Sequence, residues 1–268
     1  MLAIPLYDDN PQTRTPVVTV ALISACAAVF LWQAGLSPRA ANNAALSFGM
    51  VPSVLFGHAA LPRQLRIVPA WTSLLTSMFL HGGWLHIGGN MLYLWIFGKG
   101  VESALGPARY LSLYLICGVI AALTQAFVDP TSEVPMIGAS GAIAGVLGAY
   151  LILHPRSNVV VFIWIIIIIR LLTVPAVILL GLWFLLQVVS AASAAPGEPG
   201  VAVWAHIGGF LAGMALVMLL RQRHVQMFQA PRTWSFQVAH PRDARARFGR
   251  GSVPSAGRRP GSWRSPWN

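Results

Sequence analysis

The chain has 268 residues, of which 56 % are hydrophobic and only 9 % charged, and its net charge is +11. Because an ordinary soluble domain carries about 25 % charged residues, this composition excludes a soluble globular enzyme, a disordered chain and a coiled coil. It predicts a polytopic helical membrane protein, in which each transmembrane helix needs roughly 20 apolar residues.

Six apolar segments are interpreted as transmembrane helices. They are 16–36, 84–98, 110–128, 138–153, 171–189 and 201–220. Between the first two lies a long loop, 37–80, which is too broken to span a bilayer and too apolar to be a free linker. We therefore expect an all-α polytopic membrane protein with six transmembrane helices and an interfacial, partly helical first loop.

The apolar stretch 159–189 is difficult to divide, because Arg170 and Pro175 interrupt it. It is too long for one helix and too short for two. A helix over 159–169 would reach only about 16 Å. We interpret this first part as an interfacial piece on the cytoplasmic side, and we place the start of the fifth helix near residue 171.

The remaining segments are polar. Residues 1–15 lack the basic start of a signal peptide, and we expect a cytoplasmic N-terminal segment before a membrane domain at 16–221. Ten of the basic residues lie near the end of the chain: Arg221 and nine arginines within 222–268. Such a tail is expected to be disordered and to lie near anionic lipid in the cytoplasm rather than to bind nucleic acid.

An even number of helices places both termini on one side of the membrane. With that side cytoplasmic, fifteen of the eighteen basic residues lie inside. Only Arg39, Arg63 and Arg66 lie outside, so the charge distribution supports this orientation. All but one of the basic residues are arginines, a bias that suggests a GC-rich genome and hence a bacterial plasma membrane.

Polar side chains within transmembrane helices are candidates for function, because they are costly in lipid. His86, Asn90, Ser140 and His206 all fall in such helices. The expected topology places all four in the outer half of the membrane. They come from three different helices, and chance would scatter them in depth.

Glycine pairs with the spacing G-x-x-x-G occur on the fourth and sixth helices, next to these polar residues. They are Gly141 with Gly145, and Gly209 with Gly213. Small residues at this spacing let two helices approach closely in lipid, which would bring Ser140 near His206. The alternative is plain helix packing with two incidental polar residues.

A serine next to a histidine can act as a nucleophile, since the imidazole takes the hydroxyl proton. His86 and Asn90 are four residues apart and share one helix face, so they could donate hydrogen bonds to a developing oxyanion. The acidic residues lie in loops, in the tails or at a helix end, so we expect a dyad without an acid. The sequence holds neither a pair of aspartates within the helices for aspartyl chemistry nor the zinc motif H-E-x-x-H, which excludes these other intramembrane proteases.

Four motifs resemble those of the rhomboid intramembrane serine proteases. They are G-x-S-G at 138–141, A-H-x-x-G at 205–209, H-x-x-x-N at 86–90 and E-x-x-x-G at 102–106. His81 is similar to a further histidine often found before the second helix of that family. The resemblance covers about residues 16–220, with the motifs in the family's order.

The resemblance implies a six-helix bundle that hydrolyses peptide bonds in or near the transmembrane segments of membrane-anchored proteins. It makes Ser140 the nucleophile and His206 the general base, and it predicts no metal or cofactor. It assigns oxyanion binding to His86 and Asn90, helped by backbone N–H groups near Gly138. Trp183 either lines the side entry for the substrate or faces lipid.

One departure from the family concerns the first loop. Where members often carry Trp-Arg, this chain has Trp71 followed by Thr72. That arginine supports the loop, so its loss concerns lipid contacts and not the chemistry.

Two other functions fit a polytopic membrane protein. An inactive rhomboid-like protein would bind membrane clients, but it would lack the serine and histidine that are present here. A transporter or channel could use His86 and His206 as a proton relay, but it would need charged pathway residues, and such folds often contain internal repeats. The sequence predicts neither the substrate nor the oligomeric state.

Overall fold

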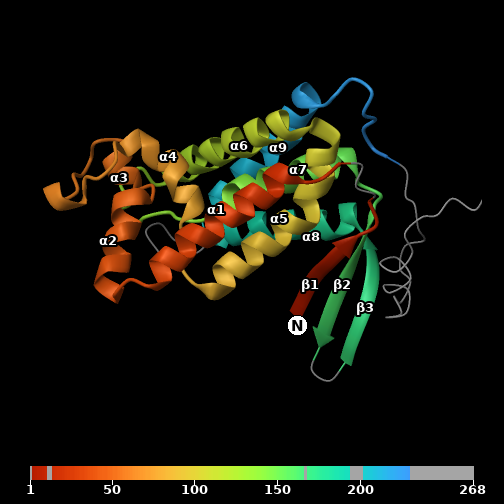
Figure 1. Cartoon of the computed structure of the whole chain (residues 1–268), viewed down its shortest axis with the longest axis horizontal. Helices are drawn as coiled ribbons and strands as arrows, with labels where there is room; N and C mark the ends of the chain where they lie inside the picture. The colour runs from red at the N-terminus through yellow and green to blue at the C-terminus, as the bar shows by residue number, and fades with distance from the viewer. Residues whose placement is uncertain (1, 11–13, 166–167, 194–201, 230–268) are drawn as a thin grey trace, which may run out of the picture.

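The computed structural model describes the chain except for residues 1, 11–13, 166–167, 194–201 and 230–268. The described part is mostly helical. Figure 1 shows a bundle of long helices, with a group of short helices at one end and a small sheet at the other. The active-site candidates lie inside the bundle.

Six helices of the bundle overlap the six predicted apolar segments, although α5 extends past residue 98 and α8 begins only at residue 176. They are α1 (Val17–Ala34), α5 (Trp84–Leu105), α6 (Pro107–Val128), α7 (Ser140–Leu153), α8 (Ala176–Ser193) and α9 (Val203–Leu220). Among the described helices, α1, α6, α8 and α9 are long and apolar enough to cross a membrane, and α7 is a shorter apolar helix. The chain is therefore an integral membrane protein, as its composition predicted.

The first loop is partly helical, as expected. It contains α2 (Pro38–Phe48), α3 (Pro52–Leu55) and α4 (Ser73–Thr76). Three short 3₁₀ turns connect or extend these helices, at Arg63–Leu65, Ala70–Thr72 and Ser77–Phe79. The side chain of Ser37 accepts a hydrogen bond from the N–H of Ala40 and caps α2.

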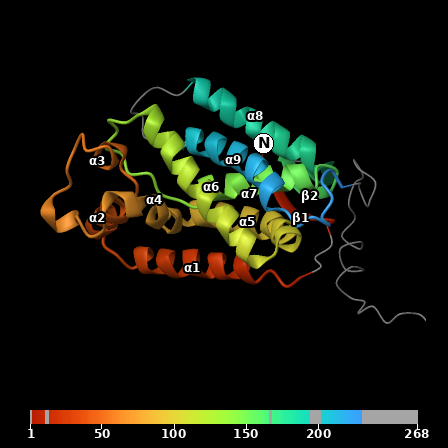
Figure 2. The same cartoon turned by 90° about the horizontal axis from the view of Figure 1, so that it is seen from above.

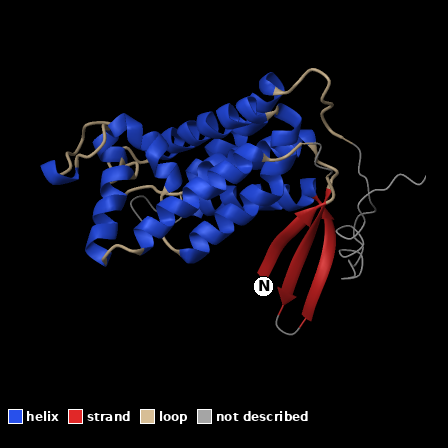
Figure 3. Cartoon of the chain, viewed as in Figure 1, coloured by secondary structure: helices blue, strands red, loops and turns tan. Residues whose placement is uncertain are grey.

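The prediction that the protein is all-α is wrong, because it contains a three-stranded antiparallel sheet (Figure 3). The strands are β1 (Leu2–Asp8), β2 (Asn158–Ile165) and β3 (Ile168–Pro175), in the order β1-β2-β3. Asn158 pairs with Pro175 and Leu2 pairs with Trp164. The 158–175 segment is rich in β-branched and aromatic residues, which favour strands. The predicted interfacial piece is therefore a hairpin, and the fifth helix begins at residue 176.

Both polar ends of the chain are partly ordered against the bundle. Besides β1 at the start, residues just after α9 hydrogen-bond to the end of α7. Phe228 N–H donates to the carbonyl of Ile152 at 3.0 Å, and Gln229 N–H donates to that of Leu153 at 3.1 Å. The predicted disorder of 222–268 is therefore wrong for residues 222–229, whose end is hydrogen-bonded to the bundle, and the rest of the prediction, over 230–268, lies outside the described residues.

Asp8 attaches the sheet to the bundle, and Asp9 joins the end of β1 to the start of β2. The hydroxyl of Tyr150 on α7 donates to Asp8 Oδ2 at 2.6 Å, and Asn158 N–H donates to Asp9 Oδ1 at 2.8 Å. Burial raises the pKa of the Asp8 carboxyl to about 6, although the Tyr150 hydrogen bond and the nearby Lys99 both oppose this shift.

Glu102, in the predicted E-x-x-x-G motif, holds the start of α1 through hydrogen bonds. Its carboxylate accepts hydrogen bonds from the N–H groups of Val18 and Thr19, each at 2.8 Å. The Thr19 hydroxyl donates a third at 2.7 Å. These first N–H groups of α1 have no acceptor within their own helix, so a buried carboxylate from the end of α5 stabilises the start of α1.

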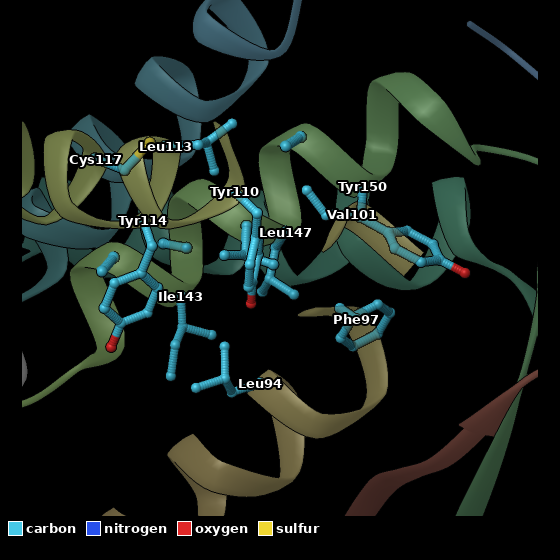
Figure 4. Packing of buried hydrophobic residues seen from close by; sticks show 14 of the residues in the cluster. Leu94, Phe97, Val101, Tyr110, Leu113, Tyr114, Cys117, Ile143, Leu147 and Tyr150 are labelled. Carbon is cyan, nitrogen blue, oxygen red and sulfur yellow. The ribbon is translucent and has the colours of Figure 1, made fainter. Parts of the chain in front are cut away.

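The hydrophobic core lies where α5, α6 and α7 meet (Figure 4). Its largest side chains include Phe97, Tyr110, Tyr114 and Tyr150, all fully buried. Nearly every residue of α7 is buried. Figure 2 shows this helix enclosed by its neighbours, and its first residue, Ser140, is partly buried at the end of the helix.

Candidate active site

Ser140 is the first residue of α7, and the backbone before it depends on Gly138. Gly138 has a φ of +127°, a conformation that favours glycine. A Cβ atom there would lie 2.8 Å from Nε2 of His86, so only glycine lets His86 approach so closely. The N–H of Gly138 donates to the carbonyl of Ser77 at 2.9 Å. The expectation that the N–H of Gly138 binds an oxyanion is therefore corrected, because in this structure that N–H already donates to the carbonyl of Ser77.

The α7 and α9 helices touch at the predicted glycines. A Cβ on Gly209 would overlap the carbonyl oxygen of Gly141, and a Cβ on Gly213 would overlap that of Gly145. A Cβ on Gly145 would in turn lie 3.1 Å from the carbonyl oxygen of Gly209. The two backbones are thus in direct contact, which only small residues permit.

This contact brings Ser140 and His206 together. His206 lies on the first turn of α9, and its Nε2 is 2.8 Å from Oγ of Ser140. The histidine is only 7 % exposed. The two side chains therefore have hydrogen-bond geometry suited to transfer of the hydroxyl proton to the imidazole.

A residue that sequence reasoning missed completes this arrangement. The other ring nitrogen of His206, Nδ1, lies 2.8 Å from Oε1 of Gln187 on α8. Trp183, one turn earlier on α8, packs its ring against the His206 ring with a centroid distance of 5.8 Å. One feature of the sequence could have identified Gln187: it is the single amide side chain in the predicted transmembrane segment 171–189, and a polar side chain there is a candidate for function.

His86 reaches the same region from the start of α5. Its Nδ1 accepts a hydrogen bond from the N–H of Gly82 at 3.2 Å. A neutral imidazole has one N–H, so Nε2 carries the proton and is a donor on the side facing Gly138. His81 packs edge-on against His86, with ring centroids 5.2 Å apart, and thus supports its orientation.

A cavity of about 780 Å³ joins these groups. Its wall contains Ser140, His206, His86 and Gly138, and it extends along α6 past Gln125. Asn90 is buried one turn beyond His86, and it is not among the described residues that line the cavity. Within the described residues, no group of three or more His, Cys, Asp or Glu side chains is arranged to hold a metal ion.

These features define a class: an integral membrane protein of mostly helical structure with a serine–histidine pair in the wall of a cavity. The chain belongs to the rhomboid family, since the family model described as "Rhomboid domain" matches residues 69–223. That range includes Ser140, Gln187, His206 and His86.

Several named rhomboid proteins are similar to this chain. Rhomboid-like protein 11, chloroplastic, of Arabidopsis thaliana is 32 % identical over 162 residues, which cover 57 % of this chain and 53 % of the relative. Rhomboid protease AarA of Providencia stuartii is 35 % identical over 112 residues, covering 37 % and 39 %. Rhomboid protease GluP of Bacillus subtilis is 42 % identical over 81 residues, covering 30 % and 15 %. The chain thus spans about half or less of the length of these relatives.

Proposed function

We propose that this protein is an intramembrane serine endopeptidase that cleaves membrane-anchored proteins in or near their transmembrane segments. The observation that carries the proposal is the 2.8 Å contact between Oγ of Ser140 and Nε2 of His206 inside a membrane bundle. The relatives named as rhomboid proteases support the same activity.

In the proposed reaction, Oγ of Ser140 attacks the carbonyl carbon of the scissile peptide bond while its proton passes to Nε2 of His206. The tetrahedral intermediate collapses as the imidazolium returns that proton to the leaving amine, which breaks the C–N bond and leaves an acyl-enzyme. A water molecule, deprotonated by His206, then hydrolyses the ester and restores the serine. No metal or cofactor takes part in these steps.

The oxyanion is assigned to donors that converge on the serine. Nε2–H of His86 is one, and the N–H of Ser140 at the start of α7 is a second, since the first N–H groups of a helix have no acceptor within it. Asn90, one turn along α5 from His86, is proposed as a further donor. Gly138 serves by letting His86 approach and not through its own N–H.

The proposed enzyme has a compact bundle of six transmembrane helices within residues 16–221, followed by a basic tail. Both termini are placed in the cytoplasm because of the distribution of basic residues. The excess of arginine over lysine favours a bacterial plasma membrane. Trp183 is proposed to line the side entry for substrate, beside His206.

The test is cleavage of a single-span membrane protein by the purified chain in liposomes. The wild type should release two fragments, and Ser140→Ala should release none while keeping the melting temperature of the wild type. Cleavage that persists in Ser140→Ala would reject the assignment of the nucleophile. An intact substrate with well-folded wild-type protein would instead favour the client-binding function.

A further inference from the structure

Helix α8 is the least buried of the apolar helices, yet it touches the histidine of the site. Only 17 % of its residues are buried, and Leu182, Leu185 and Val189 are each more than half exposed. Figure 2 shows α8 at the margin of the bundle, alongside α9. The opposite face of α8 carries Trp183 and Gln187, which both reach His206.

The hydrogen bonds of Gln187 define which end of its amide faces His206. Its Nε2 donates to the carbonyl of Trp183 at 3.5 Å, which leaves Oε1 facing Nδ1 of His206 at 2.8 Å. A carbonyl oxygen only accepts hydrogen bonds, so Nδ1 must carry the proton.

The proton on Nδ1 determines whether the other ring nitrogen of His206, Nε2, is a donor or an acceptor. A neutral imidazole with its proton on Nδ1 has a free lone pair on Nε2, the atom 2.8 Å from Oγ of Ser140. A continuous chain of donors therefore runs from the serine hydroxyl through the imidazole and the glutamine amide to the backbone of α8.

We propose that Gln187 is a positioning residue that holds His206 in the tautomer with Nδ1 protonated, and that it makes the base competent only while α8 lies against α9. The catalytic meaning of this inference rests on the proposed function. Gln187 takes the place that a carboxylate occupies in a Ser-His-Asp triad, where the acid fixes the tautomer and orientation of the histidine.

The dependence on α8 follows from the packing. Among the described residues, the only hydrogen-bond acceptor for Nδ1–H of His206 is Gln187, which lies on a helix held by few buried side chains. Displacing α8 outward by an ångström or two would break a 2.8 Å contact, while the glycine contact between α7 and α9 would keep Ser140 near the ring. The serine and histidine would then remain neighbours without a defined tautomer.

The test compares Gln187→Leu, which keeps the volume but removes the acceptor, with Gln187→Glu, which restores one. Leu186→Ala is the matched control, since Leu186 is the lipid-exposed neighbour on the same helix. We expect Gln187→Leu to lower kcat roughly 10- to 100-fold, by analogy with the cost of removing a group that orients a metal-ligating histidine, with KM unchanged. Gln187→Glu and Leu186→Ala should keep kcat near that of the wild type.

A second readout does not depend on activity. In protein labelled with ¹⁵N-histidine, the signals of His206, assigned by their loss in His206→Ala, distinguish the protonated ring nitrogen from the free one. The wild type and Gln187→Glu should show the proton on Nδ1, and Gln187→Leu should show a mixture of tautomers or the proton on Nε2.

The outcomes separate this inference from the proposed function. An inactive wild type whose tautomer still depends on Gln187 would reject the protease and keep the positioning role. An active wild type whose kcat and histidine signals are unchanged in Gln187→Leu would overturn the positioning role and keep the protease. A fall in kcat shared by Leu186→Ala would also overturn it, because the loss would then come from general packing of α8.

Discussion

His206 lies on α9 and is contacted by side chains of α8, and these two helices are attached to the bundle in opposite ways. The α9 helix presses its glycine backbone onto α7, where a Cβ at Gly209 or Gly213 would overlap a carbonyl oxygen. The α8 helix presents Gly181 to open space, where an added Cβ would meet no atom within 4 Å. Of the apolar window in each helix, 39 % is buried in α9 and 17 % in α8.

This difference separates two requirements of the site. The distance between Ser140 and His206 depends on a contact that is rigid because it joins backbone to backbone. The orientation of the His206 ring depends on side chains from a helix that faces lipid over most of its surface. In the proposed enzyme, an outward movement of α8 would therefore leave the reacting pair together and change only the orientation of the imidazole.

The largest expected effect concerns Ser140 and His206, which the contact between α7 and α9 holds together. Ser140→Ala and His206→Ala should each reduce cleavage to background, because no other described side chain replaces either group in the 2.8 Å contact. The double variant should be no worse than the single ones, since the pair acts as a unit. Rates measured with a transmembrane substrate in detergent check this, and additive losses would contradict it.

The next effect extends the comparison to α5, which supplies His86. His86→Ala should lower kcat by about 10²–10³, the usual cost of one oxyanion donor. Asn90→Ala should lower it less, because Asn90 does not line the described cavity. Steady-state kinetics separate the two variants. A change confined to KM would make His86 a substrate-binding residue instead.

Bulk added to the two helices tests the comparison directly. Gly209→Val should lower turnover on the order of 10²-fold, because a shift of about 1 Å in a reacting pair has that cost, and it should lower the melting temperature in detergent. Gly209→Ala should be milder on both counts. Gly181→Val on α8 is the matched control and should leave both quantities near wild type. Equal damage from Gly209→Val and Gly181→Val would remove the distinction between the helices.

The smallest effect concerns the sheet, which lies at one end of the bundle (Figure 1) and supplies no residue that contacts His206 among the described interactions. The pKa of Asp8 is raised from 3.8 to about 6 in the folded protein, so the folded state binds this proton more tightly than the unfolded state. Its stabilising contribution is complete below about pH 4 and is lost as the pH rises through about 6.

Acidification from about pH 7.5 to about pH 5 should therefore stabilise the wild type by about 1 kcal/mol through this group. The Asp8→Asn variant should lack that gain while keeping full activity. Thermal unfolding of both proteins at the two pH values provides the measurement, and an equal gain in both would show that Asp8 is not its source.

The parts of this structure that were predictable from sequence are those that depend on local patterns. The spacing of Gly141, Gly145, Gly209 and Gly213 indicated where two helices could touch, and the structure has a close contact there. The apolar runs predicted the positions of the six bundle helices to within a few residues, except where α5 continues past residue 98 and α8 begins at 176.

The missed parts depend on contacts between distant segments. Hydropathy does not distinguish a hairpin from a helix in the run 158–175, and β1 pairs with it across about 150 positions of sequence. The use of the Gly138 N–H by Ser77 requires knowing where the first loop ends in space. Gln187 carries no charge and matches no motif, so only the placement of α8 beside α9 shows its contact with His206.

The most direct test of the central claim, that close packing of α7 and α9 makes Ser140 a nucleophile with His206 as its base, is covalent labelling by a fluorophosphonate. The wild-type protein should gain one label, mapped by mass spectrometry to Ser140, and His206→Ala should lose it while remaining folded. Labelling at another residue, or equal labelling of Ser140 in His206→Ala, would contradict the account.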